Sequence, residues 1–113
     1  MSPPSGAAAK VERARTVFSA LGDETRMALV ARLSAGGPQS ITQLTTRADV
    51  TRQAITKHLD VLASAGLVKD SRRGRERIWE LDPTRLTEAG RTLDQISRRW
   101  DEALDSLRKF VED

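Results

Sequence analysis

A polar helix followed directly by an arginine-rich turn is the feature that most constrains this chain. Residues 51–68 read TRQAITKHLDVLASAGLV, and residues 71–81 continue as SRRGRERIWEL. In the first segment Ile55, Leu59 and Leu62 are spaced four and three residues apart, which places them on one face of a helix. The opposite face then carries hydrogen-bonding side chains, so the fold must leave that face exposed beside the arginines.

A second helix is predicted just before this one. It begins at Ser40 and turns Ile41 and Leu44 inward, and a tight connection leads to Thr51, which caps the next helix; Gly66 ends that helix. Two short helices joined by a tight turn, with a polar outer face on the second, form a helix-turn-helix.

The arginine-rich segment is predicted to be a β-hairpin. Val68, Ile78 and Trp79 are typical of strands, and Arg73-Gly74-Arg75 occupies the turn, because glycine permits a positive φ. A hairpin directly after a recognition helix is a wing. Its candidate contacts with phosphates or a minor groove are Arg72, Arg73, Arg75 and Arg77.

Composition limits the possible chemistry. The 113 residues suffice for one small domain, and they include no cysteine and a single histidine, His58. Thiolate metal sites, disulfides and cysteine nucleophiles are therefore excluded, and no glycine-rich phosphate loop or G-x-S-x-G motif occurs. An enzyme would have to use carboxylates, hydroxyls and lysines alone. We predict no catalytic residue, no metal site and no cofactor.

The positive charge is concentrated in one part of the chain. Residues 51–77 carry seven Lys and Arg against three Asp and Glu, whereas residues 83–113 carry six against seven. This excess favours a polyanion-binding face over a merely solvated one, because it lies beside a patterned helix. The polar helical face and the arginines are compatible with one ligand, double-stranded DNA.

Two more helices are predicted before the helix-turn-helix. The first spans residues 10–21, and Asp23 caps the second. Their predicted inward side chains are Val11, Ala14, Val17, Phe18 and Leu21, then Met27, Leu29, Val30 and Leu33. We predict a mainly α fold with a small β-hairpin, a winged helix-turn-helix of about five helices and a two-stranded wing. It occupies residues 10–113, after a disordered tail at residues 1–9.

The last predicted helix begins at Asp82-Pro83 and carries an a/d heptad pattern. It is too long for the core of one small domain, so part of its apolar stripe is predicted to pair with a second copy; packing against the first helix is the alternative. The predicted dimer contacts are Leu86, Leu93, Ile96, Trp100, Leu107 and Phe110, with Val17 and Phe18 from the first helix. No apolar run approaches the roughly 20 residues of a membrane span, and no signal sequence is present, so a cytoplasmic protein is expected.

Three segments in order, FSALGDETRMALVARLS (18–34), RQAITKHLDVLASAGLV (52–68) and GRERIWELDP (74–83), resemble the ArsR/SmtB family of bacterial winged-helix repressors. The resemblance implies a dimeric, operator-binding repressor that an inducer usually releases from DNA. It implies a wing tip at residues 72–77 and recognition-helix contacts at Arg52, Gln53, Thr56, Lys57 and His58.

The chain departs from the metal-sensing members of that family. These members carry cysteines near the third helix, where this chain reads SITQLTT at residues 40–46, or histidines on the last helix, where this chain has none. The chain therefore resembles the branch that does not sense metals. An inducer ligand or a partner protein remains open.

Alternatives remain for individual residues and for the whole chain. Gln53 could read an adenine edge and Lys57 a guanine edge, or both could contact only phosphate or solvent; Thr56 could contact a thymine methyl group or a phosphate. His58 lies at the boundary of the buried face, where a structural hydrogen bond competes with DNA contact. The main alternative function is a protein-interaction module that binds an acidic partner and has no preference among DNA sequences.

Overall fold

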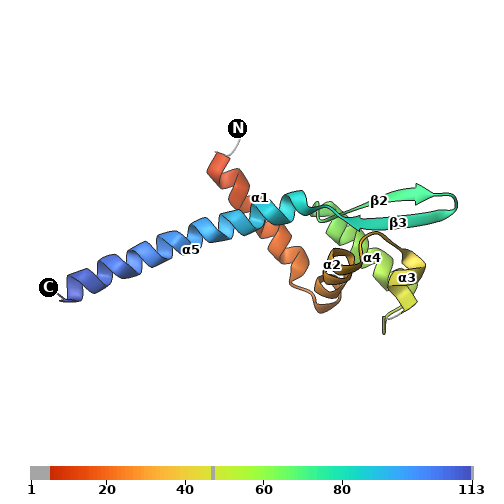
Figure 1. Cartoon of the computed structure of the whole chain (residues 1–113), viewed down its shortest axis with the longest axis horizontal. Helices are drawn as coiled ribbons and strands as arrows, with labels where there is room; N and C mark the ends of the chain where they lie inside the picture. The colour runs from red at the N-terminus through yellow and green to blue at the C-terminus, as the bar shows by residue number, and fades with distance from the viewer. Residues whose placement is uncertain (1–5, 47, 113) are drawn as a thin grey trace.

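The computed structural model describes residues 6–46 and 48–112, which form five helices and a three-stranded antiparallel sheet. In chain order these elements are α1 Gly6–Leu21, α2 Glu24–Gly36, β1 Gln39–Ser40, α3 Ile41–Thr46, α4 Arg52–Ser64, β2 Val68–Arg73, β3 Glu76–Leu81 and α5 Pro83–Glu112. Figure 1 shows the β2–β3 hairpin projecting from one end of the molecule and α5 projecting from the other. Within the described residues, no helix is both long and apolar enough to cross a membrane.

The first helix begins earlier than predicted. α1 starts at Gly6, so residues 6–9 are helical and the prediction of a disordered tail over residues 1–9 is wrong for them. Residues 7–9 are three consecutive alanines, and alanine has the highest helix propensity of all residues. The rest of the predicted tail, residues 1–5, lies outside the described residues.

Side-chain caps define where the next helices begin. Asp23 accepts a hydrogen bond from the amide of Arg26 at 2.9 Å, and Thr51 accepts one from the amide of Ala54 at 3.1 Å, as their predicted N-cap roles require.

The start of α3 has a reciprocal cap. Ser40 Oγ accepts from the Gln43 amide at 3.1 Å, while Gln43 Oε1 accepts from the Ser40 amide at 2.8 Å. This reciprocal pair is a capping box, and it fixes the first helix of the helix-turn-helix.

The sheet has one strand more than the predicted two-stranded wing. β1 pairs with β3 through Gln39 opposite Trp79 and Ser40 opposite Ile78, which gives the strand order β1-β3-β2. The turn is also shorter than predicted: Arg73 belongs to β2 and lies opposite Glu76, so only residues 74–75 connect the strands. Gly74 has a φ of 64°, which explains why glycine occupies this turn.

The core lies between the four N-terminal helices and the base of the sheet, and Trp79 is its largest fully buried side chain. Three predicted inward residues are exposed instead: Val11, Phe18 and Met27, the last at 50%. Each helical residue turns the side chain by about 100°. Met27 therefore lies well away from the stripe formed by Leu29 and its neighbours, although it is only two residues distant.

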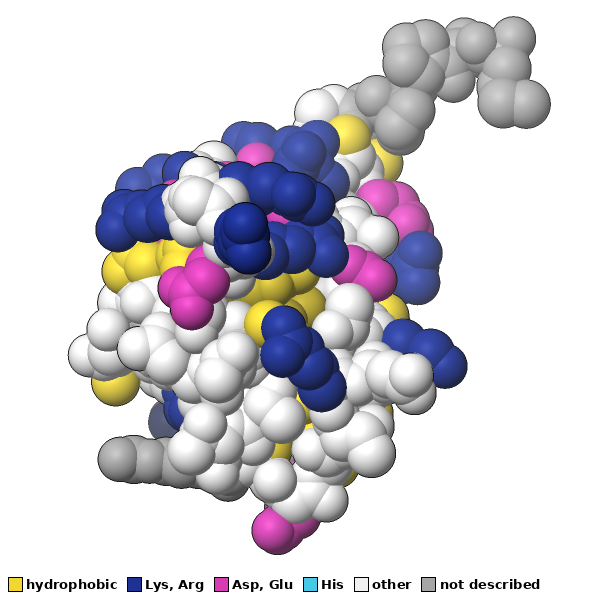
Figure 2. All heavy atoms as spheres, turned by 90° about the vertical axis from the view of Figure 1, so that its right-hand side faces the viewer, with side chains coloured by type: hydrophobic (Ala, Val, Ile, Leu, Met, Phe, Trp, Pro, Cys, Tyr) yellow, Lys and Arg dark blue, Asp and Glu magenta, His cyan; other side chains and the backbone are white. Residues whose placement is uncertain are grey.

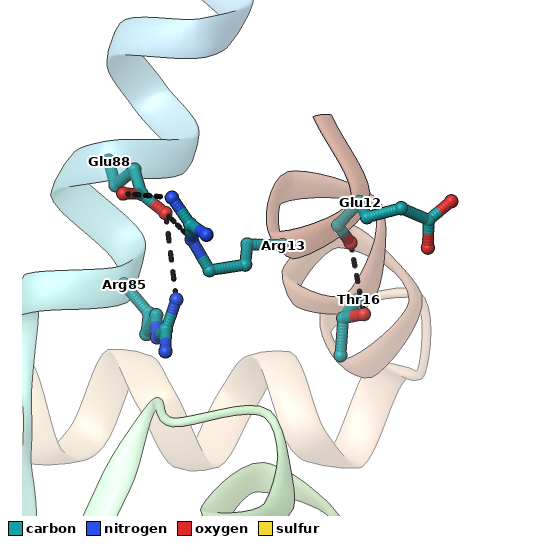
Figure 3. A network of polar contacts seen from close by, with 5 residues as sticks. All are labelled: Glu12, Arg13, Thr16, Arg85 and Glu88. Atoms are coloured by element: carbon teal, nitrogen blue, oxygen red, sulfur yellow. Dashed lines mark hydrogen bonds and ion pairs between the residues drawn. The ribbon is translucent and has the colours of Figure 1, made fainter. Parts of the chain in front are cut away.

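α5 consists of a packed part, residues 83–92, and a free part, residues 93–112, in which every residue is exposed. Its first turns lie against α1, where Ala89 and Thr92 are buried. Figure 3 shows Arg13 of α1 reaching Glu88 of α5; its guanidinium donates two hydrogen bonds to that carboxylate, at 2.6 and 3.0 Å, which lower the pKa of Glu88. Arg85 approaches the same carboxylate at 3.7 Å. The alternative prediction is that the apolar stripe of the last helix packs against the first helix. It holds for the first part of α5 only.

Candidate nucleic-acid interface

The outer face of α4 is polar and accessible, as predicted. Ile55, Leu59 and Leu62 are fully buried on the inner face. Gln53 and Lys57 are both exposed and lie four residues apart, so their side chains are neighbours on the opposite face. Exposed Arg52 is the first residue of the helix. These three side chains can reach a ligand that approaches the N-terminal half of α4.

Thr56 has part of its hydrogen-bonding capacity occupied. It is only half-exposed, and its hydroxyl donates to the carbonyl oxygen of Arg52 at 2.9 Å. What Thr56 can still offer to a base or a phosphate is its methyl group and the acceptor sites of its oxygen.

His58 faces α2 rather than the outer surface of α4. Its Nδ1 atom lies 3.3 Å from an Arg26 Nη atom and 3.7 Å from Asp23 Oδ2, and 24% of its side chain is exposed. The pKa of Asp23 is lowered, chiefly by the hydrogen bond from the Arg26 amide, with the charges of His58 and Arg26 adding to the effect. The structure does not bring His58 together with Gln53 and Lys57; its contacts are those of a residue that joins α4 to α2.

The arginines of the wing differ in whether they have a partner within the chain. Arg72, Arg73 and Arg75 are exposed near the tip. Arg77 is exposed too, but its Nε donates to Asp70 Oδ2 at 2.5 Å and its guanidinium carbon lies 4.5 Å from the centre of the Trp79 ring. The sequence alone does not reveal Asp70 as a partner of Arg77, because this pairing depends on the strand register.

The wing and the helix-turn-helix share one end of the molecule. In Figure 2, which faces that end, Lys and Arg side chains gather in the upper part of the surface, above an area that is mostly white, the colour of the backbone and of side chains that are neither charged nor hydrophobic. Figure 1 shows that the hairpin projects above α3 and the first turns of α4. A helix of this size fits a DNA major groove, about 12 Å wide, while a cationic hairpin can reach the adjacent backbone. The fold and this surface define a winged helix-turn-helix DNA-binding protein.

Comparisons with known proteins agree. A family model described as a helix-turn-helix domain matches residues 21–70. The chain is 39% identical over 95 residues to the HTH-type transcriptional regulator Rv2034 of Mycobacterium tuberculosis, covering 84% of this chain and 85% of the relative. It is 30% identical over 91 residues to the arsenical resistance operon repressor of Escherichia coli, covering 80% and 78%. A solved ArsR-like transcriptional regulator from Rhodococcus sp. RHA1 superposes with a TM-score of 0.80 and 37% identity, covering 88% and 93%. The chain belongs to the ArsR family of winged helix-turn-helix transcriptional regulators.

The predicted dimer contacts separate into three groups. Val17 is only 1% exposed and belongs to the core, so the prediction that it contacts a second copy is wrong; its three-residue spacing from Ala14 and Ala20 turns it inward. Leu86 is partly buried against the same core. The other six predicted dimer contacts are exposed in the single chain: Phe18, Leu93, Ile96, Trp100, Leu107 and Phe110.

Proposed function

We propose that this regulator is a homodimeric repressor that binds a palindromic operator through α4 and the wing. The observation that carries the proposal is the position of the polar face of α4 and the exposed wing arginines at one end of the fold. A helix face that offers amide, ammonium and hydroxyl groups can read base edges, and arginines on a hairpin can hold the backbone beside it.

Within that interface, base reading falls to the helix. Gln53 is suited to the two hydrogen-bonding positions of an adenine edge, and Lys57 to the acceptors of guanine. Arg52 adds a contact at the start of the helix, and Thr56 offers its methyl group to thymine. The exposed wing arginines without an ion-pair partner in the described chain, Arg72, Arg73 and Arg75, hold phosphates and so contribute affinity that does not depend on sequence.

The exposed stripe of α5 supports assembly of two copies. Trp100 is 65% exposed and Phe110 is 82% exposed in a single chain, and both belong to the heptad pattern. Large apolar surfaces of this kind usually mark an interface. A two-fold dimer presents two recognition helices, so the operator should be a palindrome with half-sites about one helical turn apart.

Repression by such a dimer requires only that it occupy the operator, and no catalytic group or cofactor forms part of the proposal. Metal ions are not the proposed signal. The sequence contains no cysteine and one histidine, and no group of three or more potential metal-ligating side chains occurs among residues 6–46 and 48–112. An organic ligand, a partner protein or the repressor concentration alone would then set the occupancy of the operator.

Zinc, cadmium and arsenite should therefore leave the protein–DNA complex intact. Fluorescence anisotropy of a labelled duplex, with each metal added in stoichiometric and tenfold amounts, measures this directly. Dissociation of the complex together with stoichiometric metal binding at micromolar affinity would show that the metal-independent account is wrong.

Selection of random duplexes by the purified protein, followed by sequencing, tests the proposed function. An inverted repeat should emerge, and the selected duplex should bind far more tightly than a scrambled one at moderate salt. Equal affinity for both duplexes would contradict sequence-specific regulation and favour an acidic protein as the partner of the basic face.

A further inference from the structure

The strand register divides the wing into two faces with different charge arrangements. Side chains alternate across a strand, so residues directly opposite each other share a face with the pairs two positions away. One face carries Asp70 opposite Trp79 and Arg72 opposite Arg77. Because Trp79 is buried, this inner face is the one that continues from the core.

The outer face carries the pairs Lys69–Glu80 and Arg73–Glu76, in which each cation lies opposite a carboxylate. The inner face instead places two cations, Arg72 and Arg77, directly opposite each other, an arrangement that destabilises a strand pair. Asp70 offsets this repulsion because it lies diagonally across from Arg77 and accepts its Nε hydrogen bond. That bond also lowers the pKa of the Asp70 carboxyl.

Arg77 is held by a second contact as well. Its guanidinium lies over the ring of Trp79, with 4.5 Å between the guanidinium carbon and the ring centre, and Trp79 is a fixed core residue. A guanidinium that both pairs with a carboxylate and stacks on an aromatic ring is restrained in position and partly neutralised. The side chain of Arg72 makes no ion pair or hydrogen bond with another described residue; its charge contributes to lowering the pKa of Asp70, but less than the hydrogen bond from Arg77 does.

We propose that Asp70 limits the affinity of the wing for the DNA backbone: by holding Arg77 against Trp79, it keeps Arg77 off the phosphates and leaves Arg72 as the backbone contact of the inner face. The inference rests on the proposed DNA-binding function. Each phosphate contact increases affinity for every duplex, since the backbone carries no base information. Withholding one cation therefore lowers affinity for operator and random duplexes by similar factors, and so limits how tightly the protein is held on random DNA.

The experiment compares salt dependence among matched variants of the full chain, on an operator duplex and on a scrambled duplex. Asp70→Asn frees Arg77 without adding a new cation. Glu80→Gln removes the same charge from the same hairpin, but its partner Lys69, 4.0 Å away, lies on the outer face. One additional phosphate contact steepens the slope of log K against log salt by about 0.9, or about an eightfold change in affinity for each tenfold change in salt.

We expect Asp70→Asn to steepen the slope by about one on both duplexes and to strengthen binding to the scrambled duplex several-fold, while Glu80→Gln leaves the slope unchanged. Asp70→Asn/Arg77→Gln should return the slope to the wild-type value. The single variant Arg77→Gln should leave it unchanged as well, which provides a second test should Asp70→Asn fold poorly. Equal slopes for wild type and Asp70→Asn, or a slope shallower by one in Arg77→Gln, would overturn the inference. A wild-type protein without salt-dependent DNA binding would instead contradict the proposed function itself.

Discussion

The two ends of the molecule leave opposite kinds of surface exposed. At the wing end the exposed side chains are cationic, among them Arg72, Arg73 and Arg75. At the far end of α5 they include large apolar groups, with Trp100 and Phe110 among the most exposed. Both surfaces lack a partner within the described chain, and the chemistry of each points to a different one: a polyanion for the first and a second apolar stripe for the second.

The packed part of α5 fixes the position of the rest of this helix relative to the DNA-binding end. Ala89 and Thr92 are buried against the body, and the Arg13–Glu88 pair ties α1 to α5 beside them. A dimer formed through the free part of α5 would therefore set the distance between two copies of α4. DNA binding should then depend on residues far from the DNA as strongly as on residues that contact it.

Replacing the most central apolar residue of the free stripe should have the largest effect. Trp100→Glu places an unpaired charge in the predicted seam, at a cost of several kcal/mol. We expect a monomer, or an unfolded chain, at micromolar concentration, and operator binding that falls by about a thousandfold, to the level of random DNA. Sedimentation velocity and a binding titration measure the two effects.

The matched control is Arg98→Glu. Two residues rotate the helix by about 200°, so Arg98 lies on the side opposite Trp100. This variant should remain dimeric and bind the operator. A Trp100→Glu protein that stays dimeric and binds normally would show that the far end of α5 has another role.

Changes at the wing end should be smaller and should separate base reading from backbone binding. Gln53→Ala should weaken the operator complex by about 1–3 kcal/mol and relax the preference at one base position. The control is Gln95→Ala, the same substitution at an exposed position of α5, which should have no effect on affinity. Binding to a panel of single-base operator variants checks this; an unchanged preference at every position would exclude Gln53 as a base reader.

Arg75→Ala should weaken binding to operator and random duplexes by similar factors. Its position in the turn suits phosphate contact, so the salt slope should become shallower by about one. Arg98→Ala removes the same charge from α5 and should leave the slope unchanged. If Arg75→Ala abolished sequence preference while preserving the slope, the roles of helix and wing would be reversed.

The smallest effect should arise from the cap of α4. Thr51→Ala removes the acceptor for the Ala54 amide and should lower the free energy of unfolding by about 1 kcal/mol. Thr46→Ala serves as the control, because the Thr46 hydroxyl makes a back-bond to the Thr42 carbonyl and caps no helix start. Denaturant unfolding measures both variants, and equal stability of the two would contradict the assigned cap.

The features predicted correctly from the sequence are those with a local physical cause. Asp23 and Thr51 cap helices because a side-chain oxygen at that position satisfies a free amide. The hairpin follows from Gly74 between two strand-like runs. The exposed face of α4 follows from the spacing of its three buried side chains, while the base contacts proposed for that face remain a prediction.

The features that were missed depend on contacts between distant parts of the chain. β1 has only two residues, too few to show a periodicity, and it forms because β3 offers a free edge. Val17 and Phe18 are adjacent in sequence, and packing against the other helices decides which of them is buried. The ion pair between Arg77 and Asp70 depends on the register of β2 and β3, which the two-residue turn fixes.

The most direct test of the central claim is the stoichiometry and affinity of the complex with the selected duplex, compared with duplexes that carry one half-site or a scrambled sequence. Sedimentation combined with anisotropy at moderate salt gives both quantities. We predict two chains on the palindrome, with binding at least about a thousandfold tighter than to the scrambled duplex and much weaker binding to the single half-site. One chain per palindrome, or equal affinity for all three duplexes, would contradict the account.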